Sequence, residues 1–146
     1  MQVTLREWTA EDIDNVADLE QACFSDAWTK EQLSLTFLRE GFCGLLVETD
    51  DKRLLGYVCA TSAFEDADLL IIAVAENARG QGLGGRLMDA LFAQLRLRGV
   101  ERVFLEVRLS NAAALALYEG RGFTTTRIRK KYYADGEDAA EMVKTL

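Results

Sequence analysis

Histidine and proline are both absent from the 146 residues. Without histidine there is no Ser-His-Asp triad, no Cys-His pair and no histidine-ligated zinc. Any general acid or base must therefore be Asp, Glu, Tyr, Lys or Cys, and we expect no bound metal. Cysteine is scarce as well: Cys23, Cys43 and Cys59 are widely spaced and odd in number. This spacing favours small buried side chains in a reducing compartment over a disulfide framework.

Long hydrophobic runs are also missing. The longest, residues 69–75, is too short to cross a bilayer, and the first eight residues lack the apolar stretch of a signal peptide. Lys and Arg number 17 against 24 Asp and Glu, a net charge of −7. This sign argues against direct nucleic-acid binding and leaves room for a basic partner. We therefore predict a cytoplasmic protein that binds neither membranes nor nucleic acid.

The length and the share of hydrophobic residues, 49%, predict one folded domain over residues 1–146. Capping pairs Thr9–Asp12 and Thr29–Gln32 open two helices. Leucines at four-residue spacing form a third helix, from Leu83 to near Gly99, and the fourth covers 112–121. Period-two or buried patterns predict the strands 3–8, 42–48, 54–64, 68–74, 103–107, 123–131 and 140–146.

The order of these elements is mixed. A strand hairpin comes early, and strand–helix–strand–helix comes late. This order predicts an α/β or α+β fold in which helices cover both faces of one central sheet. The strand 68–74 reads as a central strand that is buried on both faces.

The most informative segment is the loop between that strand and the third helix, which contains Gly80, Gly82, Gly84 and Gly85. Glycines let backbone N–H groups turn toward a ligand, and a helix start leaves N–H donors unpaired. Together they form a cradle for phosphate or pyrophosphate. No Lys-Ser or Lys-Thr follows the glycines, which excludes a Walker loop. A dinucleotide-binding turn, with Glu106 on the ribose, and a ligand-free flexible turn are the alternatives.

Glu106 is an acid within a strand that otherwise reads as buried. Alternation places Phe104, Glu106 and Arg108 on one face and the aliphatic residues of the strand on the other. A lone carboxylate there is costly unless it faces a cleft or finds a partner. We interpret Glu106 as a candidate general base, and a structural ion pair with an arginine is the alternative.

Five segments resemble the GNAT N-acetyltransferases. The loop Arg79-Gly80-Gln81-Gly82-Leu83-Gly84 matches the R/Q-x-x-G-x-G/A motif that binds acetyl-CoA pyrophosphate in that family. The runs Leu105–Asn111, Ala114–Glu119 and Gly122-Phe123, with Arg129–Tyr133, resemble the RimI-like ribosomal-protein-alanine acetyltransferases within it. The resemblance covers nearly the whole chain, apart from departures such as Ala27-Trp28, where these proteins usually carry Pro-Trp. It implies a GNAT fold with a mixed, mostly antiparallel sheet.

The resemblance also implies an activity and its residues. The activity is direct, ternary-complex transfer of acetyl from acetyl-CoA to the N-terminal alanine of a small-subunit ribosomal protein. Glu106 would be the base and Tyr118 the acid that protonates the departing CoA thiolate; a core aromatic is the alternative for Tyr118. Asn111 would cap its helix and touch CoA. The remaining cofactor-binding residues implied are Ile72, Ala73, Val74, Arg79, Gly80, Gln81, Gly82, Leu83, Gly84 and Gly85.

Recognition of the acceptor is assigned to four aromatic residues in or beside loops, namely Phe24, Trp28, Tyr132 and Tyr133. They are candidates for a narrow slot that takes a peptide N-terminus, and core packing is the alternative for Phe24 and Trp28. Two other functions stay open. One is a GNAT enzyme that acetylates other N-termini, lysines or small amines, and the other is a non-catalytic acyl-CoA-binding protein.

Overall fold

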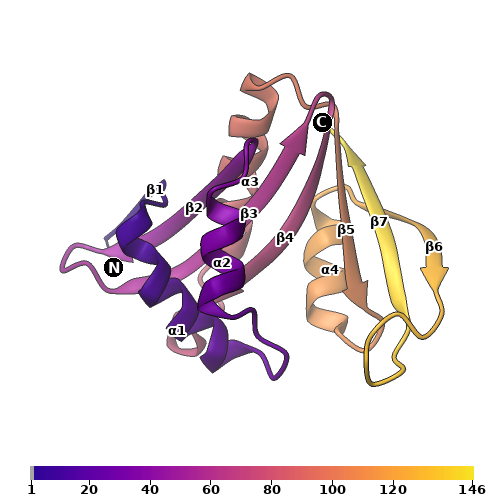
Figure 1. Cartoon of the computed structure of the whole chain (residues 1–146), viewed down its shortest axis with the longest axis horizontal. Coiled ribbons are helices and arrows are strands. Elements are labelled where there is room, and N and C mark those ends of the chain that lie inside the picture. Colours follow the sequence, from indigo (N-terminus) through magenta and orange to yellow (C-terminus); the bar gives the residue numbers. More distant parts are fainter. Residues whose placement is uncertain (1) are drawn as a thin grey trace.

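A computed structural model describes residues 2–146, and its framework is one seven-stranded sheet in the order β1-β2-β3-β4-β5-β7-β6 (Figure 1). All neighbouring strands are antiparallel except β4 and β5, which are parallel. The mixed, mostly antiparallel sheet that we expected is thus confirmed. The strands are β1 Val3–Glu7, β2 Phe42–Thr49, β3 Leu54–Ala63, β4 Asp66–Val74, β5 Arg102–Arg108, β6 Thr124–Arg129 and β7 Ala139–Thr145.

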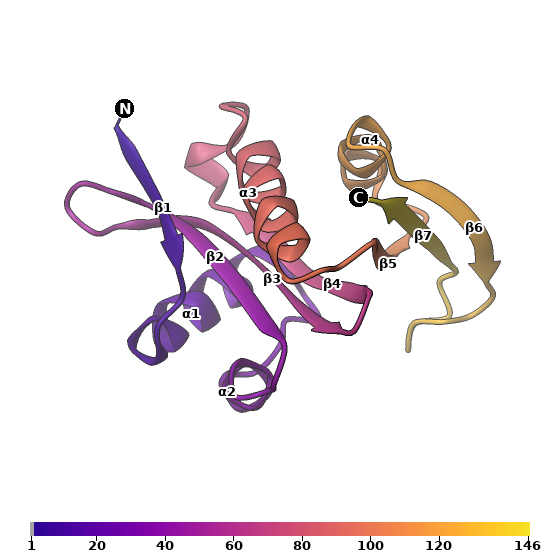
Figure 2. The same ribbon diagram turned by 90° about the horizontal axis from the view of Figure 1, so that it is seen from above.

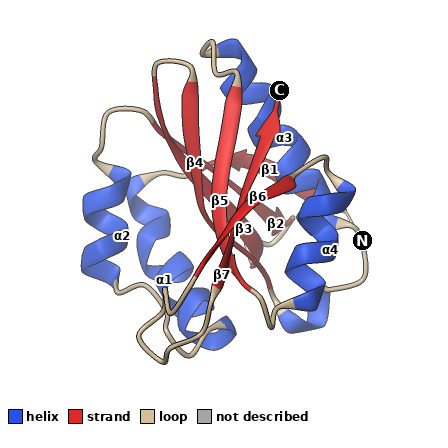
Figure 3. Cartoon of the chain, turned by 90° about the vertical axis from the view of Figure 1, so that its right-hand side faces the viewer, coloured by secondary structure: helices blue, strands red, loops and turns tan. Residues whose placement is uncertain are grey.

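Helices cover both faces of the sheet, as predicted. α1 Ile13–Cys23 and α2 Lys30–Phe37 lie on one face, and α3 Leu83–Leu97 and α4 Ala112–Gly120 lie on the other (Figures 2 and 3). Short 3-10 turns, η1 Ala10–Asp12 and η2 Glu76–Ala78, precede α1 and α3. Each face has its own hydrophobic core: Trp8, Val16, Leu33 and Tyr57 belong to the first, and the α3 leucines to the second.

The predicted capping pairs begin the two N-terminal helices. Thr29 Oγ1 accepts a hydrogen bond from the Gln32 N–H at 3.1 Å, and the Gln32 side chain accepts from the Thr29 N–H at 2.9 Å. Asp12 accepts from the Thr9 N–H at 2.6 Å, but the first turn after Thr9 is a 3-10 turn and the α-helix starts at Ile13. The paired donors and acceptors satisfy N–H groups that a helix start leaves free.

The third helix and the strand after it follow their predicted patterns. The four leucines Leu83, Leu87, Leu91 and Leu95 are all buried, and the chain leaves α3 through Gly99, whose φ is +84°. In β5, Val103, Leu105 and Val107 pack into the core beneath α3 and α4. Glu106 therefore points toward the opposite face, where α1 and α2 lie.

Strand β4 departs from the regular pattern at one residue. Its register with β3 shifts between Leu69, which pairs with Ala60, and Ile71, which pairs with Cys59, so that Leu70 has no partner. Leu70 and Ile71 consequently pack on the same side, against the α1–α2 core. Such a bulge bends the strand, and the residues that follow it point to the opposite face from the one that regular alternation would give.

Strands β4 and β5 pair with each other over only a short length. Their ladder consists of three pairs, the last of which is Asp68 with Phe104, and the two strands separate beyond it (Figure 1). The prediction that this central strand is buried on both faces is wrong in part: Asp68 is exposed, and Leu70, Ile72 and Val74 are only half-buried. These three apolar residues border the space that the separation opens, so water reaches them.

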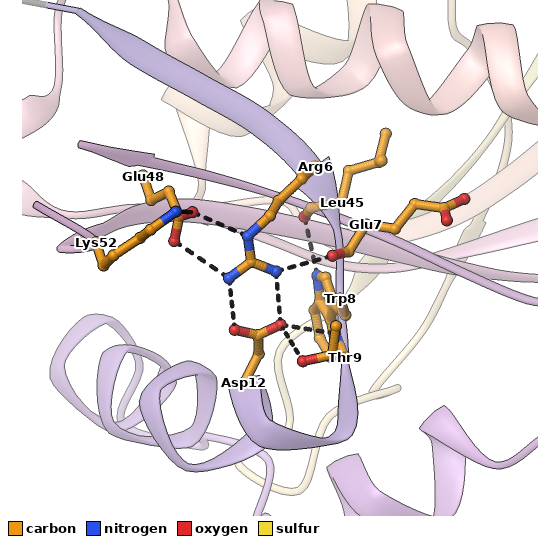
Figure 4. A network of polar contacts seen from close by, with 8 residues as sticks. All are labelled: Arg6, Glu7, Trp8, Thr9, Asp12, Leu45, Glu48 and Lys52. Atoms are coloured by element: carbon orange, nitrogen blue, oxygen red, sulfur yellow. Dashed lines mark hydrogen bonds and ion pairs between the residues drawn. The ribbon is translucent and has the colours of Figure 1, made fainter. Parts of the chain in front are cut away.

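The N-terminal strand is fixed by an ion-pair network around Arg6 (Figure 4). The Arg6 guanidinium donates to both oxygens of Asp12 at 2.8 Å and to Glu48, whose carboxylate is buried, at 2.9 and 3.2 Å. The network joins β1, η1 and β2. It lies away from the space between β4 and β5, and thus serves the fold.

Two of the three cysteines, Cys43 and Cys59, are buried as expected, whereas Cys23 is half-buried at the end of α1. Within residues 2–146 no helix has the length and apolar character needed to span a membrane.

Candidate functional site

The separation of β4 and β5 opens a cleft of about 420 Å³. One wall is the second half of β4, and the other is formed by the end of β5 together with α4. The end of α1 and the α1–α2 loop close one side, and the start of α3 closes another. The lining includes Glu20, Cys23, Phe24, Asp26, Trp28, Leu70, Ile72, Ala73, Val74, Arg79, Gly84, Glu106, Arg108, Asn111, Ala114, Leu117, Tyr118 and Tyr133.

The glycine-rich loop delivers free N–H donors to one end of this cleft. Gly80 and Gly82 have φ of +78° and +77°, and the space where their Cβ atoms would lie is open. The first helical hydrogen bond of α3 runs from the Arg86 N–H to the Gly82 carbonyl. In the described chain the N–H groups of residues 83–85 have no hydrogen-bond partner. The turn therefore has the geometry of an anion cradle.

Other predicted members of this loop have different places. Arg79 turns back to the cleft, where its Nε donates to the Val74 carbonyl at 3.0 Å. The Leu83 side chain is buried in the core, and Gly85 lies against Arg121, so only the backbone of these two is available to a ligand. Gly84 lines the cleft directly, whereas Gln81 is exposed beside it.

Glu106 is exposed on the cleft wall. Its Oε2 accepts a hydrogen bond from the Tyr132 hydroxyl at 3.2 Å. Among residues 2–146 it takes part in no ion pair. The structure therefore does not show the arginine-paired alternative for Glu106.

Tyr118 lies across from β4 on α4 and is 7% exposed. Its ring packs against Phe123, while its side chain borders the cleft. Burial raises the pKa of its hydroxyl to about 12, and Tyr133 adds to the effect. The hydroxyl consequently keeps its proton at neutral pH, as a proton donor requires. Thus Tyr118 is a core aromatic and also borders the cleft.

Asn111 is the N-cap of α4, and its Oδ1 accepts from the Ala114 N–H at 3.1 Å. The capping role is therefore clear, and the same residue lines the cleft. Backbone groups of Ile72, Ala73 and Val74 lie beyond the last β4–β5 pair, so their β5-side edge lacks a strand partner. That edge offers N–H and carbonyl groups to a ligand.

The aromatic residues proposed for the acceptor gather at the same cleft. Phe24 and Trp28 come from the α1–α2 loop, and Tyr133 comes from the β6–β7 loop. Tyr132 packs edge-on against Tyr133 with ring centroids 5.1 Å apart. Its hydroxyl donates to Glu106, a residue of the cleft wall. Core packing also holds for Phe24 and Trp28, which border the α1–α2 core.

Arg108 joins the α1–α2 loop to the β6–β7 loop, a role that the sequence did not reveal. Its guanidinium binds Asp26 at 2.8 Å, Asp135 at 2.9 Å and Glu137 at 3.0 Å. It also lies over the Tyr133 ring, 4.0 Å from the centroid. Hydrogen bonds from Ser110 and Arg108 lower the pKa of Glu137. Alternation placed Arg108 beside Glu106, but no local pattern identifies its partners.

Glu20 is the second residue that we missed. It lies in α1 at a position of the inward face shared with Ile13, Val16 and Ala17, and it is 2% exposed. A signal was available, since an acid on the apolar stripe of a helix needs a partner.

In the described residues no group of three or more His, Cys, Asp or Glu side chains is placed to hold a metal ion.

Comparison with known proteins gives consistent matches. The model of the Acetyltransferase (GNAT) family matches residues 13–123. A protein of Bacillus subtilis (strain 168), provisionally named a ribosomal protein bS18-alanine N-acetyltransferase, is 35% identical over 99% of this chain and 97% of its own length. The Salmonella typhimurium protein of that name is 42% identical over 63% of this chain and 64% of its own length.

A solved structure agrees in its fold. The crystal structure of the ribosomal-protein-S18-alanine N-acetyltransferase from Escherichia coli has a TM-score of 0.91 to this chain and is 32% identical. The match covers 99% of this chain and 94% of the other.

Proposed function

Because the chain belongs to the GNAT acetyltransferase family, we propose that it transfers the acetyl group of acetyl-CoA to the N-terminal alanine of a small-subunit ribosomal protein. The relatives named for this acetylation support the choice of acceptor. The observation that carries the proposal is the cleft. It brings an unpaired carboxylate, Glu106, a protonated phenol, Tyr118, and the free N–H groups at the start of α3 to one cavity.

Acetyl-CoA would bind in this cleft as the first substrate. Its pyrophosphate would bind to the N–H groups of residues 80–85, where the helix dipole adds about 0.3–1 kcal/mol per charge. The pantetheine arm, which carries amides, would pair with the open edge of β4 at Ile72–Val74. Asn111 and Arg79 border the same channel.

Glu106 would act as the general base. A free α-amino group has a pKa of about 7.7–8.0, far below the value of about 10.4 for lysine, so part of it is already neutral at pH 7. The remaining proton leaves as the amine attacks the thioester carbonyl. The Glu106 carboxylate accepts that proton directly or through one water.

The attack creates an oxyanion and then expels a thiolate. A backbone N–H on the free edge of β4 would stabilise the oxyanion. The Tyr118 hydroxyl would donate its proton to the departing CoA sulfur, whose conjugate thiol has a pKa of about 8.5 and leaves readily. Glu106 and Tyr118 thus serve opposite ends of the same displacement.

Direct transfer in a ternary complex is favoured over an acyl-enzyme. The thiol in the cleft, Cys23, lies 3.9 Å from the Val74 carbonyl and 3.7 Å from the Arg79 guanidinium. Neither group is a base that would remove its proton, and the chain has no histidine to do so.

The acceptor would enter between the α1–α2 and β6–β7 loops, past Phe24, Trp28, Tyr132 and Tyr133. The net charge of −7 would attract the basic tail of a ribosomal protein. Ribosomal proteins are made in the reducing cytoplasm, an environment that suits three free cysteines.

The proposal is tested by following CoA release with two basic peptides, one that begins with alanine and one with a blocked N-terminus and internal lysines. We expect acetylation of the first and at least a tenfold lower kcat/KM for the second. Equal rates would indicate a broader amine acetyltransferase. Binding of acetyl-CoA without turnover of either peptide, or of other amines, would indicate an acyl-CoA-binding protein.

A further inference from the structure

The carboxylate of Glu20 is buried at the end of the cleft with no cation beside it. Its neighbours on the inward face of α1 are aliphatic, and within residues 2–146 no ion pair involves it. A buried carboxyl group is costly unless its oxygens find hydrogen-bond donors, so the two hydrogen bonds that Glu20 accepts stabilise it in this position.

These two hydrogen bonds come from distant places in the fold. Glu20 Oε1 accepts from the hydroxyl of Tyr57, a fully buried residue of β3. Glu20 Oε2 accepts from the Trp28 backbone N–H at 3.0 Å. Burial and the contact with Glu20 raise the pKa of Tyr57, so its hydroxyl stays a donor. One carboxylate therefore joins α1, the sheet and the α1–α2 loop.

The α1–α2 loop, residues 24–29, packs Phe24 and Trp28 against the α1–α2 core but has few other hydrogen bonds to the rest of the fold. It has no strand partner, and it contains no proline to stiffen it. In the described residues its backbone forms only one hydrogen bond to a side chain outside the loop and α2, and that is the bond to Glu20. The Asp26 side chain adds the ion pair with Arg108 across the cleft.

We propose that Glu20 is a positioning residue for the acceptor: through Trp28 it holds the α1–α2 loop in place against the cleft. This inference rests on the proposed function. Phe24, Asp26 and Trp28 form the acceptor side of the cleft, so the position of that side depends on Glu20. The acetyl-CoA side is built on α3, α4 and β4 and does not depend on the loop.

The test compares Glu20→Gln with the wild type. A glutamine keeps the size of the side chain but has one accepting oxygen instead of two, so one of the two donors loses its partner. We expect the KM for the alanine peptide to rise about tenfold, with kcat and acetyl-CoA affinity within about twofold. Hydrogen–deuterium exchange of residues 24–29 should accelerate.

Glu48→Gln is the matched control. Glu48 is also a buried glutamate, 4% exposed, but it binds Arg6 and lies outside the cleft. Both substitutions should lower the melting temperature. Only the one at Glu20 should change the acceptor KM and the exchange of the loop.

Tyr57→Phe is a second variant, which removes one donor and leaves the Glu20–Trp28 bond. It should change the KM in the same direction by a smaller factor, and it decides the matter if Glu20→Gln does not fold. An unchanged KM and unchanged loop exchange would overturn the inference. A wild type that acetylates no peptide would contradict the proposed function instead, and loop exchange alone would then decide the role of Glu20.

Discussion

At the scale of single residues, the proposed chemistry depends on two side chains whose surroundings differ. Glu106 stands exposed on the cleft wall with one hydrogen bond from Tyr132, whereas Tyr118 is nearly buried and holds its proton. Glu106 is accessible from the cleft, and Tyr118 carries a proton at neutral pH. Their places on β5 and α4, on the same cavity, make each role testable by a substitution that preserves shape.

Glu106→Gln should lower kcat for the alanine peptide by about 100-fold or more, because the amide cannot accept the ammonium proton. Acetyl-CoA binding, measured by calorimetry, should stay within about twofold of the wild type. The residual activity should rise with pH, since a higher pH supplies the neutral amine without a base. A kcat close to that of the wild type would remove Glu106 from the mechanism.

Tyr118→Phe should also lower kcat by about 100-fold, because the thiolate then leaves without a proton donor. The KM for the peptide should change little, since the ring and its packing on Phe123 are kept. Steady-state kinetics at saturating acetyl-CoA are the measurement. If the only effect is a lower melting temperature, Tyr118 is a core residue and nothing more.

At the scale of elements, the start of α3 and the separation of β4 from β5 together create the proposed acetyl-CoA site. The bulge at Leu70 and the short ladder ending at Asp68 and Phe104 free one edge of β4. The glycine turn then places N–H donors at the end of that edge. Either feature alone would leave a solvated strand edge or an ordinary helix start.

Gly82→Ala should weaken acetyl-CoA binding by about tenfold or more. Gly82 has a φ of +77°, which costs a residue with a side chain about 1 kcal/mol and shifts the turn that aims the N–H groups. Gly99→Ala is the matched control, because Gly99 has a φ of +84° and open space around it at the far end of α3. Isothermal calorimetry and thermal unfolding compare the two.

Both alanine variants should lose similar stability, and only the one at Gly82 should lose affinity. If the affinities of the two variants match that of the wild type, the turn does not bind the diphosphate.

At the scale of the whole molecule, acid stability should depend on the Arg6 network that joins β1, η1 and β2. The hydrogen bonds from Arg6 are the main cause that lowers the pKa of Asp12 from 3.8 to about 2. A carboxyl group whose pKa is lower in the folded state than in the unfolded chain stabilises the fold at every pH above its unfolded-state pKa. That stabilisation is lost as the pH falls through the range from 3.8 to about 2.

Asp12→Asn should therefore lower the free energy of unfolding at pH 7 by about 1–3 kcal/mol and flatten its decline below pH 4. Urea unfolding at several pH values measures both. Asp14→Asn is the control, since Asp14 is exposed and forms only a surface pair with Lys30, worth about 0–1 kcal/mol. If the free energy of unfolding depends on pH in the same way in the wild type and in Asp12→Asn, the Arg6 network does not contribute to acid stability.

Much of this molecule was readable from the sequence because the relevant forces act locally. Capping pairs three residues apart, leucines at helical spacing and alternation in β5 involve neighbours along the chain, so the helices, the strands and the facing of Glu106 followed from them. The glycine loop could also be predicted from the sequence, because its glycines are neighbours along the chain. The catalytic role of Tyr118 and the CoA contacts of Asn111 and of the Ile72–Val74 backbone came from family resemblance, and they stay predictions, whereas the structure confirms Asn111 as the N-cap of α4.

Only the tertiary structure decided how distant segments meet. The Leu70 bulge, the early end of the β4–β5 ladder and the cleft between them depend on strand register, which no single strand encodes. Arg108 and Asp26 are 82 residues apart, and Tyr57 and Glu20 are 37 apart. Such contacts form only when helices and strands pack, because packing chooses which polar groups lose water together and must therefore pair.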